Sequence, residues 1–444
     1  MQKTPMETWI LRKIQGSSEV GGTLTRARID DYQLTKLRET IALARDKSRF
    51  YKTTLAEFPA HEIRSFADFA QLPFTTSDDL RQDSLRFLCT SQDDISRIVT
   101  LESSGTTGSP KRIYFTADDQ ELTVDFFHQA LPGIAKPGDK VMILLPSERF
   151  GSVGGLFAES ARRMGVQTVA HGLVQDPAAT LEVMEREQVN MLLGIPVQLL
   201  ALASYEPPGA SYYRTHIENV ILNTDHIPKA LVQRLQDKWG CRVFNHYAMT
   251  EMGMAGGVEC EAFAGLHLRE ADLLFEIINP TTGEVVPDGE EGEVVFTTLT
   301  RKGMPLIRYR TGDISRFIPE RCPCGTVLKR MVPVKERVGG GTVLANGELI
   351  NMSMLDEALF AVRGLLNFQA EITVDDGMDR LAITAKVAIW AEEDIQGLIR
   401  QALLSIRVIA DHVHRGVLML EPVVVDQTGT PWNPSKRIIR DLRK

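Results

Sequence analysis

The chain has 444 residues, of which 43% are hydrophobic and 24% are charged. At roughly 150 residues per domain, this length predicts about three compact units with a sizeable core, and the composition excludes disorder as the main state. Fifty Lys and Arg against 58 Asp and Glu give a net charge of −8, which argues against a protein that coats nucleic acid.

The expected location is the cytoplasm. The start of the chain mixes charged and apolar side chains and lacks the apolar run of a secretory signal. The most apolar window, residues 191–204, is interrupted by Pro196 and Gln198 and is shorter than the roughly 20 residues that span a bilayer. Five cysteines in a chain of this length do not form a disulfide framework.

The pattern of apolar residues predicts an α/β fold. Residues 1 to 95 favour helices, with a helix over 30–51 and an N-cap at Thr76 or Ser77. Strand-like and helical runs then alternate up to residue 245, which predicts a mostly parallel sheet covered by helices. The expected strands are 97–103, 140–146, 167–172, 189–195 and 218–224, and the expected helices are 116–134, 153–165, 177–187, 196–206 and 229–240.

The pattern changes after residue 256. Short strands separated by Gly, Pro and Asp turns up to residue 334 predict a small β-barrel or sandwich. A run of three glycines at 339–341 favours a linker. Beyond it, expected strands at 368–374, 380–389 and 416–425, with a helix over 392–407 between the last two, predict a small α+β domain.

A loop that suits a phosphate group follows the first expected strand. Its glycines let backbone amides approach an anion, its hydroxyls donate hydrogen bonds, and Lys111 adds positive charge. The spacing differs from GxxxxGK[ST], so a P-loop fold is not implied. Taken alone, the Ser/Gly/Thr composition also fits an ordinary loop. The residues that we assign to phosphate binding besides Lys111 are Ser103, Ser104, Gly105, Thr106, Thr107 and Gly108.

Four motifs resemble those of the adenylate-forming acyl-activating enzymes. They are SSGTTGSPK at 103–111, HYAMTEMG at 246–253, LIRYRTGDI at 306–314 and PSKRIIRDLRK at 434–444. Segments 48–82, 259–284 and 321–325 are most similar to the phenylacetate–coenzyme A ligases, so the resemblance runs from about residue 48 to 444. It implies a large N-terminal domain over 1–335, a hinge over 336–341 and a mobile C-terminal domain over 342–444.

The resemblance also implies an activity. Such enzymes join a carboxylic acid to ATP with Mg²⁺ and then transfer the acyl group from the adenylate to coenzyme A. The implied catalytic residues are Lys436, which neutralises developing charge, Thr250, which reaches the α-phosphate, and Glu251, which binds Mg²⁺. Both charged residues also have a purely structural explanation. Glu251 also fits an acid at the start of a helix, and Lys436 also fits a solvated basic tail.

Further residues are implied in nucleotide binding. Tyr247 suits stacking on adenine, and Asp313 suits the two ribose hydroxyls, although it also fits a turn. Arg337 is implied as a second ribose or phosphate contact. Asp225 and His246 complete the expected nucleotide site.

Cysteine spacing suggests a second site. Cys322 and Cys324 form a tight Cys-Pro-Cys-Gly turn, and Cys260 and His267 flank a loop in the same β-rich region. Three thiolates and one imidazole are a common structural zinc set, and some phenylacetate–coenzyme A ligase relatives carry it. The alternative is buried free thiols. Cys89 and Cys241 lack such company and are expected in the core.

The sequence departs from the family at several places. Glycines 339–341 replace the acidic pair usual in the hinge, and Ser435 stands where Gly commonly precedes the catalytic lysine. Glu148 and Arg149 stand where relatives tend to carry aromatic and small residues, near the expected acyl pocket. The residues that we assign to that pocket are Phe150, Ala248, Met249 and Met254.

The resulting prediction is an aryl-acid–coenzyme A ligase. One alternative loads the acyl group onto the phosphopantetheine arm of a carrier protein. Another transfers AMP to a non-carboxylate acceptor, and a non-enzymatic nucleotide-binding regulator is disfavoured because the expected charged residues are all present. The acid, the acceptor and the oligomeric state, including a homodimer, are left open.

Overall fold

The computed structural model describes residues 3–16, 21–101, 110–149, 151–205, 216–345, 347–427 and 437–443. The chain divides into two compact units. The first consists of Met1–Gly138, Glu148–Gln167 and Phe244–Val334, and the second of Asp139–Ser147, Thr168–Val243 and Lys335–Lys444. The division that the sequence predicts at 336–341 stays a prediction.

Helices dominate the start of the first unit, as the sequence predicts. The 22-residue helix α2 begins after Thr25, whose hydroxyl accepts the backbone N–H of Arg28. Thr76 caps α5 through a capping box with Asp79. The helices of this unit are α1 (Met6–Gln15), α2 (Arg26–Lys47), α3 (Arg49–Thr54), α4 (Phe66–Phe69), α5 (Ser77–Asp83), α6 (Ala117–Ala130) and α7 (Val153–Arg163).

The strands of the first unit are antiparallel. β1 (Ile95–Leu101) pairs with β2 (Lys111–Thr116), and β10 (Leu273–Ile278), β11 (Gly292–Thr298) and β12 (Tyr309–Ser315) follow one another across a sheet. A further antiparallel run has the order β13-β9-β8-β7. Its strands are β7 (Arg242–Tyr247), along which the chain passes from the second unit into the first, β8 (Gly257–Glu259), β9 (Leu266–Leu268) and β13 (Arg330–Met331).

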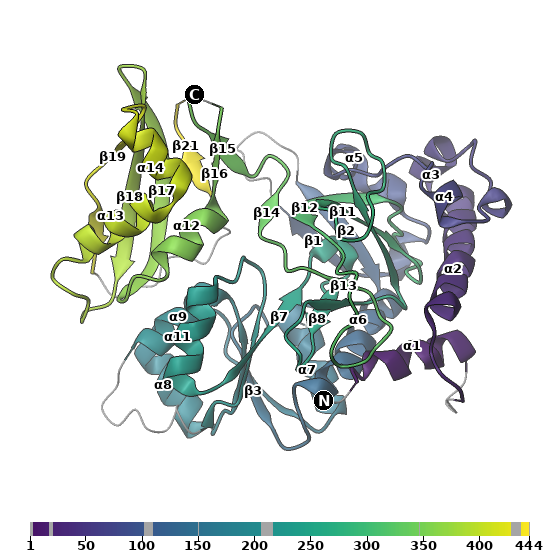
Figure 1. The fold of residues 1–444 in the computed structure, drawn as a ribbon. Coiled ribbons are helices and arrows are strands. Elements are labelled where there is room, and N and C mark those ends of the chain that lie inside the picture. The colour runs from purple at the N-terminus through teal and green to yellow at the C-terminus, as the bar shows by residue number, and fades with distance from the viewer. Residues whose placement is uncertain are drawn as a thin grey trace. The chain divides into compact units, whose positions relative to one another are not determined.

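The second unit contains the parallel strands that the alternating pattern predicts. β3, β5 and β6 pair in parallel, and the order continues to β4. Helices α8, α9 and α11 lie together beside these strands (Figure 1). The elements are β3 (Lys140–Ile143), β4 (Gln167–Ala170), α8 (Pro177–Arg186), β5 (Met191–Gly194), α9 (Pro196–Ser204), β6 (Asn219–Leu222) and α11 (Lys229–Trp239).

The C-terminal part of the second unit is α+β, as expected. The long antiparallel pair β17 and β18 is covered by α13 and α14 (Figure 1), whose Ile399 and Ile409 are fully buried. The elements are β14 (Glu336–Arg337), β15 (Gly341–Val343), β16 (Leu349–Asn351), α12 (Met352–Leu359), β17 (Leu365–Asp375), β18 (Met378–Val387), α13 (Ile395–Ser405), α14 (Arg407–His414), β19 (Leu418–Leu420), β20 (Val424–Asp426) and β21 (Ile439–Asp441).

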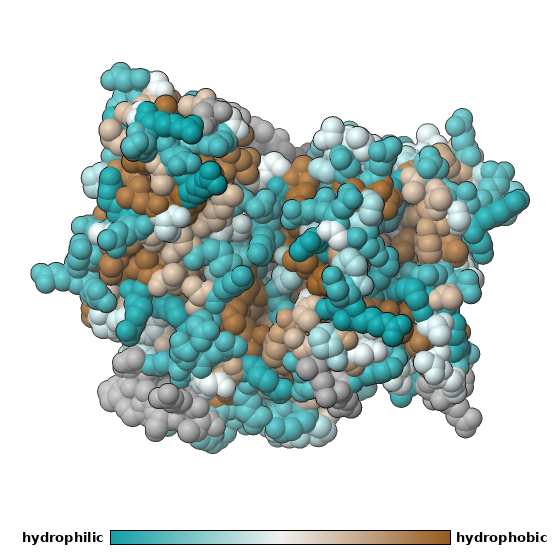
Figure 2. All heavy atoms as spheres, in the orientation of Figure 1, coloured by the Kyte–Doolittle hydropathy of each residue, from teal (hydrophilic) through white to brown (hydrophobic). Residues whose placement is uncertain are grey.

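Polar and hydrophobic residues are interspersed on the face of the molecule drawn in Figure 2. The apolar window at 191–204 forms β5 and α9, and most of its side chains are buried in the second unit. Within the described part of the chain, no helix combines the length and the apolar character that a bilayer crossing requires.

Candidate active site and metal centre

Three elements of the first unit bring a cation, an acid and a phenol together. Lys111 begins β2, Glu251 lies in the short 3₁₀ turn η5 (Thr250–Met252) after β7, and Tyr309 begins β12. The Lys111 ammonium forms an ion pair with Glu251, and it lies 3.2 Å from the Tyr309 hydroxyl. That hydroxyl also donates to Glu251 Oε1 at 3.2 Å. Ser77 Oγ lies 3.3 Å from the same ammonium.

The charges of this group are buried. Only 11% of the Lys111 side chain and 4% of the Glu251 side chain are exposed. A buried charge is tolerated when it is paired and hydrogen-bonded, and here each ion has a counter-charge and a hydroxyl. The arrangement therefore holds a positive and a negative group in fixed positions at one end of β2.

Arg301 fixes the turn that carries Glu251. Its Nη1 donates to the Glu251 carbonyl at 2.8 Å and its Nη2 to the Tyr114 carbonyl at 2.9 Å, so it joins η5 to β2. The guanidinium lies over the Phe115 ring, 4.4 Å from its centroid. Burial lowers the pKa of Arg301 to about 10, which still leaves the guanidinium charged at neutral pH.

A second polar pair joins two of the predicted nucleotide residues. The hydroxyl of Tyr247, at the end of β7, donates to Asp313 Oδ2 at 2.8 Å. The backbone N–H of Asp313 donates to Thr311 Oγ1 at 3.0 Å, which orients the carboxylate within β12. Tyr247 and Asp313, 66 positions apart in the sequence, thus meet in the structure, and their roles at the adenine and the ribose stay predictions.

His246 lies in an apolar environment. Successive strand residues point to opposite faces, so its ring points away from the side to which Tyr247 projects. It packs against Phe127 at 5.4 Å and Phe126 at 6.5 Å between ring centroids. Neither ring nitrogen has a hydrogen-bond partner among the described residues, and burial lowers the pKa of His246 to about 4.

The turn around Glu251 also gathers the expected acyl-pocket residues. Met254 donates its backbone N–H to the Met249 carbonyl at 2.9 Å, so the two methionines lie at the two ends of one turn. Gly253 adopts a φ of 83°, a conformation that favours glycine, and its carbonyl accepts the Thr123 hydroxyl. Ala248, Met249 and Met254 are half-buried, whereas Glu148 and Arg149 are exposed.

The remaining predicted nucleotide residues fall elsewhere. Asp225 and Arg337 belong to the second unit, where Asp225 accepts a hydrogen bond from Arg437 Nε at 3.2 Å and Arg337 is exposed in β14. Residues 103–108, Phe150 and Lys436 lie outside the described residues. The site is therefore described through Lys111, Tyr247, Thr250, Glu251 and Asp313.

Two residues of this site were not predicted from the sequence. Tyr309 lies in the RYRTGD motif, where only Asp313 was assigned a role. The motif was the available signal, because Tyr309 stands only four residues before Asp313 in it. Arg301 carries no comparable local signal, since its role depends on carbonyls 50 and 187 positions away in the sequence.

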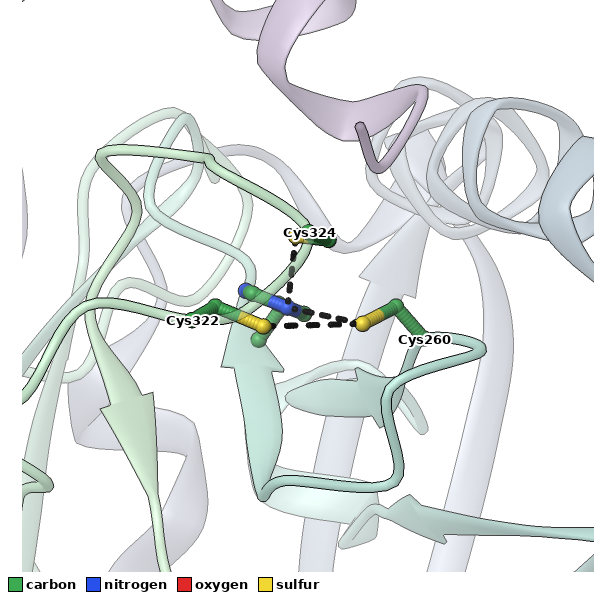
Figure 3. A group of neighbouring side chains, drawn as sticks. Cys260, Cys322 and Cys324 are labelled. Atoms are coloured by element: carbon green, nitrogen blue, oxygen red, sulfur yellow. Dashed lines mark hydrogen bonds between the residues drawn. The ribbon is translucent and has the colours of Figure 1, made fainter. Parts of the chain in front are cut away.

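The predicted cysteine and histidine cluster assembles in the first unit. Cys260 follows β8, His267 lies in β9, and Cys322 and Cys324 lie in the turn before β13. The three cysteine side chains point toward one another (Figure 3). Gly325, with a φ of 83°, closes the turn through a hydrogen bond from its N–H to the Cys322 carbonyl. Ligand atoms of all four residues lie within 4.8 Å of one another, and all four are buried.

The distances fit a tetrahedral metal. The sulfurs of Cys260 and Cys322 are 3.7 Å apart, and His267 Nε2 lies 3.3 Å from Cys260 Sγ and 3.7 Å from Cys324 Sγ. Bonds of about 2.3 Å to sulfur and about 2.0 Å to nitrogen would separate neighbouring tetrahedral ligands by about 3.5 to 3.8 Å. All five cysteines are free thiols.

The thiols differ in acidity. Burial raises the pKa of Cys260 to about 12 and also raises the pKa of Cys322. Burial acts in the same direction on Cys324, but hydrogen bonds, above all with His267, outweigh it and lower the pKa of Cys324 to about 6. A divalent cation would favour the thiolate form of all three, because metal ligands must be deprotonated.

Comparison with known proteins relates this chain to AMP-binding enzymes and to proteins named as coenzyme A ligases. Residues 50–299 match the family described as AMP-binding enzyme. The chain is 27% identical to a phenylacetate-coenzyme A ligase of Thermus thermophilus, over 88% of each chain, and 28% identical to one of Aromatoleum evansii, over 82% of each chain. Its fold is similar to that of 2-hydroxyisobutyryl-CoA ligase in complex with an acyl-AMP, with a TM-score of 0.78 and 20% identity over 95% of this chain and 90% of that one.

Proposed function

The chain belongs to the AMP-binding enzyme family, and from this premise we propose that it activates an aromatic carboxylic acid with ATP and transfers the acyl group to coenzyme A. Two relatives named phenylacetate-coenzyme A ligase, matched over more than four fifths of the chain, support this activity. The observation that carries it is the clustering of Lys111, Glu251 and Tyr309 in the unit that also pairs Tyr247 with Asp313.

In the first step, an oxygen of the acid attacks the α-phosphorus of ATP, and the bond to pyrophosphate breaks. The Lys111 ammonium binds phosphate oxygens, and Thr250 donates to the α-phosphate from the same turn that carries Glu251. Asp313 accepts hydrogen bonds from the ribose hydroxyls, and the Tyr247 ring stacks on the adenine. In this proposal, Lys436 neutralises the charge that develops between the carboxylate and the α-phosphate.

Glu251 is the proposed ligand for Mg²⁺, which prefers carboxylate and phosphate oxygens. When bound, this cation neutralises charge on the phosphate oxygens. Arg301 supports the position of Glu251 through its backbone carbonyl and leaves the carboxylate oxygens to other partners. The carboxylate of Glu251 suits the cation chemically, and the cation would replace the Lys111 ammonium that is paired with it in this structure.

In the second step, coenzyme A loses its thiol proton to water, the sulfur attacks the acyl carbon, and AMP leaves with the electrons of the broken C–O bond. We propose an acid with one carboxylate and an aromatic ring, because Ala248, Met249 and Met254 supply apolar, adaptable contacts beside η5. A cytoplasmic location agrees with both substrates, ATP and coenzyme A.

We further propose that Cys260, His267, Cys322 and Cys324 bind one structural zinc ion. Four protein ligands, whose atoms lie within 4.8 Å of one another, would fill a tetrahedral site and leave no open coordination position for chemistry. The ion would tie the turn before β13 to the segment from β8 to β9, which continues from the turn carrying Glu251.

The activity is tested with purified protein, ATP, Mg²⁺, coenzyme A and a panel of aryl acids. The expected result is acid-dependent release of pyrophosphate together with an acyl–coenzyme A thioester. Pyrophosphate release without thioester for every acid would reject coenzyme A as the acceptor and favour a carrier protein. AMP transfer to a hydroxyl compound without any acid-dependent exchange would reject the ligase proposal.

A further inference from the structure

The hydroxyl of Tyr309 is shared between the two charges of the candidate active site. It lies 3.2 Å from the Lys111 ammonium and donates to Glu251 Oε1 at 3.2 Å. A phenol has one donor and two acceptor positions, so the same oxygen can accept from the cation while it donates to the carboxylate. Tyr309 is therefore a third partner of an ion pair whose two charges have separate tasks in the proposed reaction.

The surrounding strands hold Tyr309 in place. Thr75 bridges to it on one side, because its N–H donates to the Arg308 carbonyl at 3.1 Å and its carbonyl accepts the Arg310 N–H at 2.9 Å. The tyrosine ring packs against Phe296, its cross-strand partner on β11, with 5.4 Å between ring centroids. Arg308 adopts a φ of 46°, a conformation that a residue other than glycine keeps only where the surrounding structure enforces it. The hydroxyl thus has a fixed position at the start of β12.

The two charges differ in the partners that remain to them when their ion pair opens. The Lys111 ammonium has Ser77 Oγ at 3.3 Å as well as Tyr309. Among the described residues, Tyr309 is the one side chain besides Lys111 that hydrogen-bonds the Glu251 carboxylate. When Mg²⁺ replaces the ammonium at this carboxylate, the orientation of Glu251 depends on Tyr309.

We propose that Tyr309 is a positioning residue that orients the Glu251 carboxylate for Mg²⁺. The inference rests on the proposed function, because it needs Glu251 to bind the cation and Lys111 to bind phosphate. A hydrogen bond from Tyr309 to Oε1 leaves the second carboxylate oxygen, Oε2, for the cation. Carboxylates that bind metals are themselves typically held by hydrogen bonds, and loss of such a bond weakens metal binding.

The test is calorimetric titration of the full chain with MgATP and, separately, with AMP in the absence of metal and acid. AMP is the metal-free probe, because it lacks the β- and γ-phosphates and brings no cation to Glu251. We expect Tyr309→Phe to weaken MgATP binding about tenfold or more and to change AMP binding less than about twofold.

Tyr51→Phe is the matched control. Tyr51 is also buried, and its hydroxyl accepts the N–H of Ile307 at 2.9 Å, two residues before Tyr309. This variant therefore loosens the same segment without removing a partner of Glu251. It should bind MgATP and AMP as tightly as the unaltered chain does.

A second pair of variants asks whether Tyr309 acts through the Glu251 carboxylate. Adding Tyr309→Phe to Glu251→Gln should weaken MgATP binding by less than about twofold, because the charge that the hydroxyl orients is already gone. Thermal unfolding checks that each variant is folded. If Tyr309→Phe alone does not fold, the comparison of Glu251→Gln with the double variant decides.

Three results would overturn the proposal. They are equal affinity of Tyr309→Phe and the unaltered chain for MgATP, an equal loss of affinity for MgATP and AMP, and a further loss of about tenfold in the double variant. In each case the proposed function stands as long as the unaltered chain binds MgATP. If the unaltered chain does not bind MgATP, the proposed function fails, and the role of Tyr309 fails with it.

Discussion

The ammonium of Lys111 is paired with the carboxylate of Glu251, and the Tyr309 hydroxyl lies 3.2 Å from an atom of each. The two charged residues come from segments 140 positions apart in the sequence. In the proposed reaction, the Lys111 ammonium binds phosphate and the Glu251 carboxylate binds a metal ion. In this structure, each of these two charges neutralises the other. Loss of either residue should therefore lower both the stability and the activity of the protein, and the two effects can be measured separately.

Lys111→Met should destabilise the chain and abolish acid-dependent ATP–pyrophosphate exchange. Removing one partner of a buried ion pair leaves an uncompensated charge and costs about 3–5 kcal/mol. The double variant Lys111→Met, Glu251→Gln should regain most of that stability without regaining activity. Urea unfolding and isotope exchange measure the two effects, with the exposed Lys52→Met as control. Exchange by the double variant at the original rate would contradict both assigned roles.

Local patterns predicted the elements and the cysteine cluster well. The N-cap at Thr76 and the mostly parallel pairing, seen in β3, β5 and β6, were predicted from local signals, and the structure confirms both. The first expected strand instead forms β1 in an antiparallel pair with β2. That pairing and the role of Arg301 were not predicted, because both depend on contacts between distant segments.

Cys322→Ser should lower both zinc content and stability. The unaltered protein, purified without chelators, should contain about one zinc per chain, because the four ligand atoms lie within 4.8 Å of one another. Cys89→Ser is the matched control, since Cys89 is also buried but belongs to another part of the core. Elemental analysis and thermal unfolding provide the measurements. A protein without zinc, or equal zinc loss in both variants, would count against the site.

His246 should make the chain less stable in acid. Its pKa is lowered from 6.5 to about 4 by burial, so the unfolded chain binds this proton more tightly than the folded chain does. The stabilisation that neutral His246 gives the folded chain is fully present above pH 6.5. It is lost progressively as the pH falls from 6.5 to about 4. Between pH 7 and pH 5 the loss amounts to about 2 kcal/mol. His246→Phe should flatten the pH dependence by that amount in urea unfolding, and the exposed His61→Phe should not. If the free energy of unfolding depends on pH equally steeply in His246→Phe and in the unaltered protein, this ring does not titrate as described.

Lys436→Ala should separate the two half-reactions. The lysine is proposed to neutralise charge only while the acyl–phosphate bond forms, so adenylate formation should fall by several orders of magnitude. Thioester formation from a presynthesised acyl-adenylate and coenzyme A should persist, because that step does not need this charge. Arg440→Ala is the matched control, since Arg440 is exposed in β21, where it pairs with Glu371. Pyrophosphate exchange and thioester formation are measured separately on each variant. If Lys436→Ala impairs both half-reactions equally, the residue acts through the stability or position of the C-terminal segment, and its proposed role in adenylate formation is wrong.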